Sequence, residues 1–474
     1  MSPDSGSAAE RLWWFRDARE PLPPPRPRRL RWLHRQETLD ALACLSLSTL
    51  CFSQARRELL FRPGWDFYNL TPLGAPALAA FVLNIVGLAA LGYLAARWTR
   101  RIQRPAWLRL AAGAAAVALL ASLNFARITH QTVSRWTDVI GLPGLLVLVV
   151  LVLTASLSWP RPALRMIRGV ALVTSPLAIL TIALVPWMFL ELGAGPTWRL
   201  VDPAPLKRTP PSLRRVVWLV FEELDQRIAF EARPSGLELP ELDRLRRESL
   251  YADAARPPAG ATAVAVPGPN TAGPLVRVAP LNPRDLELIF QDGKAAQWSA
   301  QSNVFTSVRT LGYDTALIGW RLPYPRVLGG ALGLAHWRPS VDFEQARGRT
   351  VGEALANQWA SLAPPVHRRR LLSARVAELT DLAIRTAVDY RYGLVFLHLP
   401  VPQPPGVYDR ASERLTASNF RGEGEGYVDN LALADRIIGE LRRGLDRARL
   451  GDVTRIVVSS TRSWQAAARY GGHT

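Results

Sequence analysis

Long apolar runs alternate with short basic hinges through the first 190 residues of the chain. Each run is close to the roughly 20 residues that cross a bilayer as a helix. For a single run, a buried helix of a soluble protein is the alternative, but a succession of runs with charged hinges favours membrane spans. The pattern therefore predicts five spans, at Thr38–Gln54, Leu73–Ala96, Trp107–Asn124, Val139–Trp159 and Gly169–Leu190.

The arginines of the hinges predict how these spans are oriented, because Lys and Arg in short loops are retained on the cytoplasmic side of the membrane. The N-terminal arm and the second and fourth hinges are strongly basic, whereas the first and third hinges mix arginines with acidic residues. The N-terminus is therefore expected in the cytoplasm and everything after Leu190 outside it. A transporter is disfavoured, because no buried ionisable residue marks a pathway through the spans.

The periodicity changes after residue 212, where short apolar runs alternate with helical patterns. This alternation is typical of an α/β domain with a largely parallel, doubly wound sheet. Strands are expected at 215–221, 314–319, 393–399 and 454–460. The predicted organisation is a disordered basic cytoplasmic arm at 1–36, a five-helix membrane domain at 37–191, a linker at 192–212 and the α/β domain at 213–474.

The composition indicates which classes of partner and which cysteine sites can be expected. A net charge of +19 is compatible with binding to phosphate backbones, but many of the arginines are explained by topology, and Lys occurs only at Lys207 and Lys294. We therefore expect no nucleic acid partner. Cys44 and Cys51 both lie in the first predicted span, which excludes a disulfide framework and a cysteine zinc site.

The residues that follow each predicted strand are the candidates for chemistry, because ligands gather beyond the carboxyl ends of parallel strands. The first strand ends in Glu222, Glu223 and Asp225, whose oxygens suit a divalent cation or, alternatively, a solvated helix start. Further on, Thr262 follows a Pro- and Gly-rich loop. A hydroxyl at a helix start serves as a nucleophile if a metal activates it, and otherwise as a helix cap.

The order of these features resembles the alkaline phosphatase superfamily, and within it the sulfatase-like branch of lipoteichoic acid synthases and phosphoethanolamine transferases. The resemblance is carried by a strand that ends in a carboxylate, then "LPELDRL", then the loop before Thr262, then "LGYDTALIGWRLPYPRVLG", "VFLHLPVPQPPGVYDR" and "GYVDNLALADRIIGEL". Proteins of this branch likewise join five membrane helices to one external catalytic domain.

The resemblance implies a mechanism and a location. A divalent metal (Mn, Zn, Mg or Ca) bound by Glu222, with Glu223 as a further candidate ligand, would activate Thr262 for attack on a phosphate or sulfate ester. The substrates would be esters of lipid headgroups or glycans, and membrane lipids would be partners. The chain would reside in the bacterial inner membrane, with its α/β domain in the periplasm.

The chain departs from the branch where two further metal ligands are expected. An Asp-His pair normally follows the last strand, but Thr461 and Arg462 stand here, and Gln403 stands where a loop histidine is common. Arg462 cannot bind a cation, because guanidinium has no lone pair and stays charged. The branch's domain normally continues beyond the point where this chain ends, so the domain is expected to be truncated at its C-terminus, with His473 as a late candidate ligand.

Two functions therefore stay open. The first is a membrane-anchored hydrolase or phosphotransferase with Thr262 as its nucleophile and a divalent metal. The second is a catalytically inactive relative without metal, a tethered scaffold or anion-binding protein in which Arg462, Gln403 and His398 contact a phosphate, sulfate or carboxylate. His398 also fits a third role, that of a buried histidine satisfied at a strand end.

Overall fold

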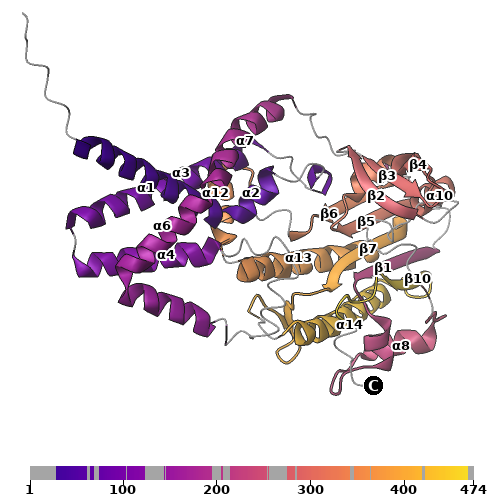
Figure 1. Ribbon diagram of the computed structural model, residues 1–474. Coiled ribbons are helices and arrows are strands. Elements are labelled where there is room, and N and C mark those ends of the chain that lie inside the picture. The colour runs from indigo at the N-terminus through magenta and orange to yellow at the C-terminus, as the bar shows by residue number, and fades with distance from the viewer. Residues whose placement is uncertain are drawn as a thin grey trace, which may run out of the picture.

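A computed structural model of the chain describes residues 28–60, 65–68, 74–102, 104–122, 144, 146–194, 204–206, 214–253, 255, 275–282, 285–341, 346–362, 364–418 and 422–467. It consists of a helical N-terminal region and an α/β domain with a parallel sheet, as the sequence predicts (Figure 1).

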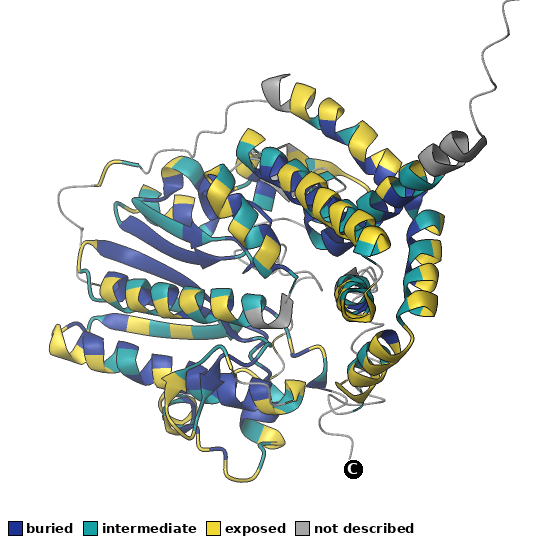
Figure 2. Ribbon diagram, turned by 90° about the vertical axis from the view of Figure 1, so that its left-hand side faces the viewer, coloured by how far each residue is buried: buried dark blue, intermediate teal, exposed yellow. Residues whose placement is uncertain are grey.

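The helical region is built from apolar helices that expose many large side chains (Figure 2). Exposed apolar residues include Leu83, Leu94, Leu110, Leu151 and Leu190. The helices of this region are α1 (Arg28–Cys51), α2 (Ser53–Leu60), α3 (Ala75–Ile102), α4 (Pro105–Ser122), Leu146–Ser158, α6 (Pro160–Val173) and α7 (Ser175–Ala194). The first of them, α1, begins inside the segment predicted to be a disordered arm.

The prediction of five membrane spans is not confirmed. Among the described residues, only α3 is long and apolar enough to cross a bilayer by itself. A second crossing exists if Leu146–Ser158 and α6 form one span, although these helices meet at 115°. The apolar parts of α4 and α7 are shorter, and part of the predicted span Val139–Trp159 lies outside the described residues.

The expectation that the spans hold no buried ionisable residue is wrong at Asp40 of α1, which is 6% exposed. Its carboxylate pairs with Arg100 at the end of α3 and with Arg168 of α6, whose Nε lies 3.0 Å from Oδ1. Three helices therefore meet at one buried carboxylate, an arrangement that compensates its charge.

The α/β domain is organised around a five-stranded parallel sheet in the order β10-β1-β7-β5-β6. The strands are β1 (Arg215–Glu222), β5 (Asp314–Trp320), β6 (Leu334–Arg338), β7 (Tyr392–Pro402) and β10 (Thr454–Ser460). Four of them are the predicted strands. The fifth, β6, is short and only partly buried, so it lacks the apolar run that identifies the others.

Both faces of this sheet are covered, as in a doubly wound fold. Alternate side chains such as Val395 and Leu397 pack into one core cluster, while Leu394 and Phe396 pack into another on the opposite face. The first cluster is formed with α8 (Pro240–Glu248), α13 (Pro364–Ala387) and α14 (Glu423–Arg447).

The second cluster involves α10 (Val304–Thr310), which has a helical sequence pattern, and elements that the sequence pattern did not reveal. The latter are α11 (Tyr324–Leu328) and an antiparallel sheet of β2 (Leu275–Asn282), β3 (Asp285–Phe290) and β4 (Ala295–Gln297). Besides these, the described chain has a small hairpin, β8 (Tyr408–Asp409) with β9 (Arg414–Leu415).

The α/β domain contacts the helical region through α12 (Val351–Ala360), which packs against α3 (Figure 1). Asn84 of α3 donates to Gln358 of α12 at 2.9 Å, and the amide of Gln358 donates to the carbonyl of Ala77 at 3.1 Å. Buried polar groups thus join the two parts. The predicted domain boundaries and the truncated C-terminus stay predictions.

Candidate functional site

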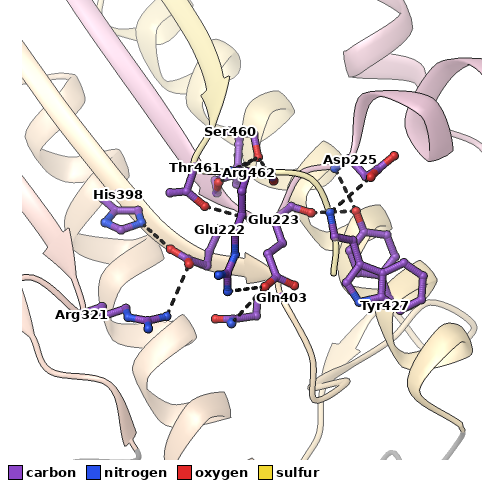
Figure 3. Close-up of polar contacts among 12 residues, drawn as sticks. Glu222, Glu223, Asp225, Arg321, His398, Gln403, Tyr427, Ser460, Thr461 and Arg462 are labelled. Atoms are coloured by element: carbon purple, nitrogen blue, oxygen red, sulfur yellow. Dashed lines mark hydrogen bonds and ion pairs between the residues drawn. The ribbon is translucent and has the colours of Figure 1, made fainter. Parts of the chain in front are cut away.

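The carboxyl ends of the parallel strands bring together most of the residues singled out from the sequence (Figure 3). Because parallel strands end at the same edge of a sheet, residues far apart in the chain become neighbours there. We refer to this group as the strand-end cluster; its members are Glu222, Glu223, Arg321, His398, Gln403, Thr461 and Arg462.

Glu222, the last residue of β1, is fully buried and contacts His398 and Arg321. Its Oε2 lies 2.9 Å from Nε2 of His398, and its Oε1 lies 3.6 Å from Nη1 of Arg321. Burial alone would raise the pKa of this carboxyl. The hydrogen bond from His398, together with the charges of Arg321 and Arg462, outweighs burial and lowers the pKa below its ordinary value.

His398 completes a buried chain of polar contacts that reaches Tyr324 of α11. Its Nδ1 lies 2.7 Å from the Tyr324 hydroxyl, whose pKa is raised first by burial and then by the charge of Glu222. A neutral imidazole with its proton on Nε2 satisfies both neighbours, because it donates to Glu222 and accepts from Tyr324. Both ring nitrogens are therefore used inside the protein, and the side chain is 0% exposed.

Glu223 is held in a left-handed backbone conformation with φ of 65°, which residues with a side chain rarely adopt. Its Oε1 accepts from Nη2 of Arg462 at 2.6 Å and from Nε2 of Gln403 at 3.4 Å. Its pKa is raised by burial, and the charge of Arg462 offsets only part of that effect. Glu223 is thus a buried carboxylate whose charge is compensated first by Arg462.

Arg462 is brought to this position by the continuation of β10. The Thr461 amide donates to the carbonyl of Phe221 at 3.0 Å, and Ser460 Oγ donates to the carbonyl of Arg462 at 2.7 Å. Thr461 itself is buried, and its Oγ1 accepts from the Glu223 amide at 3.3 Å. These contacts fix the turn after β10, so the guanidinium points toward Glu223 (Figure 3).

Asp225 stands apart from the strand-end cluster and stabilises the backbone next to it. Its Oδ1 accepts from the Ile228 amide at 3.0 Å and its Oδ2 accepts from the Trp464 amide at 3.2 Å. Tyr427 of α14 stacks on Trp464 with a ring separation of 4.2 Å, and its hydroxyl donates to the Glu223 carbonyl at 2.8 Å. Asp225 therefore acts as a cap for the following turn.

The donor set of the strand-end cluster does not fit a divalent cation. Glu222 and Glu223 are already paired with Arg321 and Arg462, and a cation beside them would be repelled by both guanidinium groups. Over the part of the chain that the structure describes, no group of three or more His, Cys, Asp or Glu residues is placed to hold a metal.

Two residues expected to take part in the chemistry cannot be placed. Thr262, the candidate nucleophile, and His473, the late candidate ligand, lie outside the described residues. Their roles stay predictions, as do those of Glu222, Arg462, Gln403 and His398 in binding a metal or an anion.

Two residues of this site were missed from the sequence, Arg321 and Tyr324. Arg321 follows β5 directly and, like Glu223, has a left-handed backbone, with φ of 66°. The rule that chemistry lies just after each parallel strand would have singled it out, since it follows the predicted strand at 314–319 by two residues. No comparable local signal marks Tyr324, because its contact with His398 depends on the packing of α11.

Comparison with known proteins does not identify the function of this site. No protein-family model and no curated protein matches the chain. Among solved structures, the chain is similar to the integral membrane protein lipooligosaccharide phosphoethanolamine transferase A of Neisseria meningitidis, at 14% identity and a TM-score of 0.32, over 90% of this chain and 82% of that chain. A TM-score this low supports no inference about chemistry, so the function has to be argued from the site.

Proposed function

We propose that this chain is a membrane-tethered protein whose α/β domain serves as a metal-independent binding or scaffold module and does not turn over phosphate or sulfate esters. One observation carries the proposal. Each carboxylate at the end of β1 is paired with an arginine from another strand end, Glu222 with Arg321 and Glu223 with Arg462.

These pairs take over the electrostatic role of a metal. A buried carboxylate needs a compensating positive charge, and a guanidinium that donates hydrogen bonds supplies it. A divalent cation would have to displace an arginine and leave that charge buried without its partner. The arginines would therefore disfavour metal binding even if a further ligand approached from outside the strand-end cluster.

The tether is argued from the helical region. Apolar side chains on the outside of α3, α4 and α7 would be costly in water and favourable in a bilayer. With the arginine-rich hinges inside, the α/β domain would face the periplasm of a bacterium, where lipid headgroups and glycans with phosphate or sulfate groups are available as partners.

The alternative function is an ester hydrolase or phosphotransferase in which a metal bound by Glu222 activates Thr262. It requires ligands for that metal beyond the strand-end cluster. Metal content and turnover separate the two functions, because the enzyme needs both and the scaffold needs neither.

The test measures Mn, Zn, Mg and Ca by elemental analysis in detergent-purified protein, together with release from generic phosphodiester and sulfate-ester substrates. We expect no stoichiometric metal and no release that depends on Thr262, judged with Thr262→Ala. In the double variant Thr461→Asp/Arg462→His, which restores the missing pair, we expect Mn or Zn binding. Arg462→Met is the matched control, since it removes the charge without adding a ligand.

Stoichiometric metal in the wild-type protein, with turnover that disappears in Thr262→Ala, would overturn the proposal and establish the enzyme. Metal binding by Arg462→Met alone would show that the arginine charge, more than the lost ligands, keeps the cation away.

A further inference from the structure

Glu223 combines an unusual backbone with a buried charge. Among the described residues, four with side chains have positive φ, namely Glu223, Arg321, Glu413 and Arg449. Such a conformation is unfavourable for a residue with a side chain and persists only when surrounding contacts enforce it. At Glu223 those contacts include the pair with Arg462, so the side chain is held at the strand edge against a backbone preference for glycine.

The two oxygens of the Glu223 carboxylate are not equally hydrogen-bonded. Arg462 and Gln403 both donate to the same oxygen, Oε1. A carboxylate has two oxygens and room for about four hydrogen bonds, so this one is bound less completely than a phosphate or sulfate group in the same place could be. Among the described residues, Glu223 therefore leaves part of its acceptor capacity unused.

Arg462 and Arg321 also have unused capacity. The Nε of Arg462 is buried without a hydrogen-bond partner in the described chain, although a guanidinium offers five donors in a planar fork. The side chain of Arg321 is 35% exposed, and its contact with Glu222 is long, at 3.6 Å. Planar forks of this kind match the oxygens of phosphate and sulfate, which they bind through two parallel hydrogen bonds.

We propose that Glu223 occupies, as an internal anion, a binding site for a phosphate or sulfate group that is formed by Arg462, Arg321 and Gln403. The proposal rests on the proposed function, because it requires that no metal occupies the strand-end cluster. With Glu223 in place, the charges of the two carboxylates and the two arginines cancel. Without it, one positive charge is in excess, and an external oxyanion is the ligand that compensates it.

The experiment replaces Glu223 and measures binding of inorganic sulfate and inorganic phosphate to the full chain in detergent with EDTA present, by calorimetry and by thermal stabilisation. We expect Glu223→Gly to bind these anions at least about tenfold more tightly than the wild type, since it frees charge-assisted donors and suits the left-handed backbone. A short-chain phosphatidic acid is the parallel probe. Tighter binding of this lipid than of inorganic phosphate would identify a headgroup as the source of the anion.

Two controls make the result specific. Glu413→Gly removes another left-handed glutamate, with φ of 55°, from a site where the side chain is 76% exposed, and should leave anion binding unchanged. Glu223→Gly/Arg462→Met should lose the gained binding. Glu223→Gln, which keeps the size of the side chain, replaces the glycine variant if that variant does not fold.

Equal anion binding by Glu223→Gly and Glu413→Gly, or a gain that survives loss of Arg462, would overturn the internal-anion proposal and leave the scaffold proposal standing. Stoichiometric metal in the wild-type protein would instead remove the scaffold proposal, whatever the anion measurements show.

Discussion

Asp435 of α14 shows how a single buried carboxylate supports this fold. Its Oδ1 accepts from the Leu242 amide in the first turn of α8 at 2.7 Å, so it caps a helix that is distant in sequence. Burial raises its pKa to about 6, and backbone hydrogen bonds from Leu242 and Glu241 offset only part of that effect. The folded protein therefore holds a proton on Asp435 more tightly than the unfolded chain does.

A raised pKa of this kind makes stability depend on pH. The contribution of Asp435 is fully present below its ordinary pKa of 3.8 and is lost as pH rises through about 6. Asp435→Asn keeps an oxygen acceptor for Leu242 but cannot ionise. The Tm of this variant, relative to that of the wild type, should therefore increase as pH rises from about 4 to about 7.

Asp243 provides the opposite control, because its pKa is lowered first by the hydrogen bond with Arg233. Its contribution is present above its ordinary pKa and is lost as pH falls, so Asp243→Asn should lose stability relative to the wild type at neutral pH. Tm measured by thermal unfolding from below the ordinary Asp pKa of 3.8 up to about pH 7 checks both signs, and parallel curves for wild type and Asp435→Asn would contradict the assignment.

At the scale of elements, α12 is one of the parts of the α/β domain that join it to the helical region. Gln358 is 0% exposed; it accepts from Asn84 and donates to the carbonyls of Ala77 and Ala346. Gly348 lies close beneath α12, since a Cβ there would come within 2.4 Å of the Ala354 amide nitrogen. The loop at Gly348, α12 and α3 are thus held together by polar contacts and close packing.

Gln358→Leu should weaken this junction. The change keeps most of the side-chain volume but leaves Asn84 and two carbonyls without their partner, at a cost of about 1–3 kcal/mol for each buried group that stays unsatisfied. We expect a lower Tm in detergent and faster proteolysis of the α/β domain. Ala356→Leu, at an exposed position of the same helix, should change neither, and equal behaviour of the two variants would show that the junction contributes little.

At the scale of the whole molecule, the charge pattern and the apolar helices predict which side of the membrane each part occupies. Arginines gather at the end of α3 and in the hinge after it, and the α/β domain follows α7. Cys44 is partly buried and Cys51 is buried in α1, so the wild-type chain offers little background for thiol labelling.

Labelling with a membrane-impermeant maleimide tests this topology in spheroplasts. Ala411→Cys, on the exposed β8–β9 turn, should react from outside, whereas Arg104→Cys, in the hinge after α3, should react only after the membrane is permeabilised. The unmodified chain is the control. Reaction of Arg104→Cys in intact spheroplasts, with no reaction of Ala411→Cys, would reverse the predicted orientation.

Local patterns identified the strands that carry the site. β1, β5, β7 and β10 were found because each is an apolar run long enough to be buried, and Glu222 because it follows the first predicted strand. Gln403 and Arg462 were singled out through the family resemblance, as residues that stand where ligands were expected. The antiparallel β2–β4 sheet was not found, because Arg277 and Pro280 interrupt the apolar run of β2, none of whose residues is fully buried, and because β4 has only three residues. The number of membrane spans was not predicted correctly from local patterns either, because α1 has buried polar residues such as Asp40 and Ser46 among its apolar ones.

The sequence by itself determined the parallel sheet, the edge where its polar residues gather and the absence of an Asp-His pair after β10, because each depends on residue type and on a short period along the chain. Only the tertiary structure decided that Arg321 compensates Glu222 and that Arg462, 239 residues further along the chain, compensates Glu223. The reason is that these pairings depend on the order of the strands in the sheet and on the left-handed turns at Glu223 and Arg321. Neither the strand order nor these turns can be predicted from the residues next to them in the sequence.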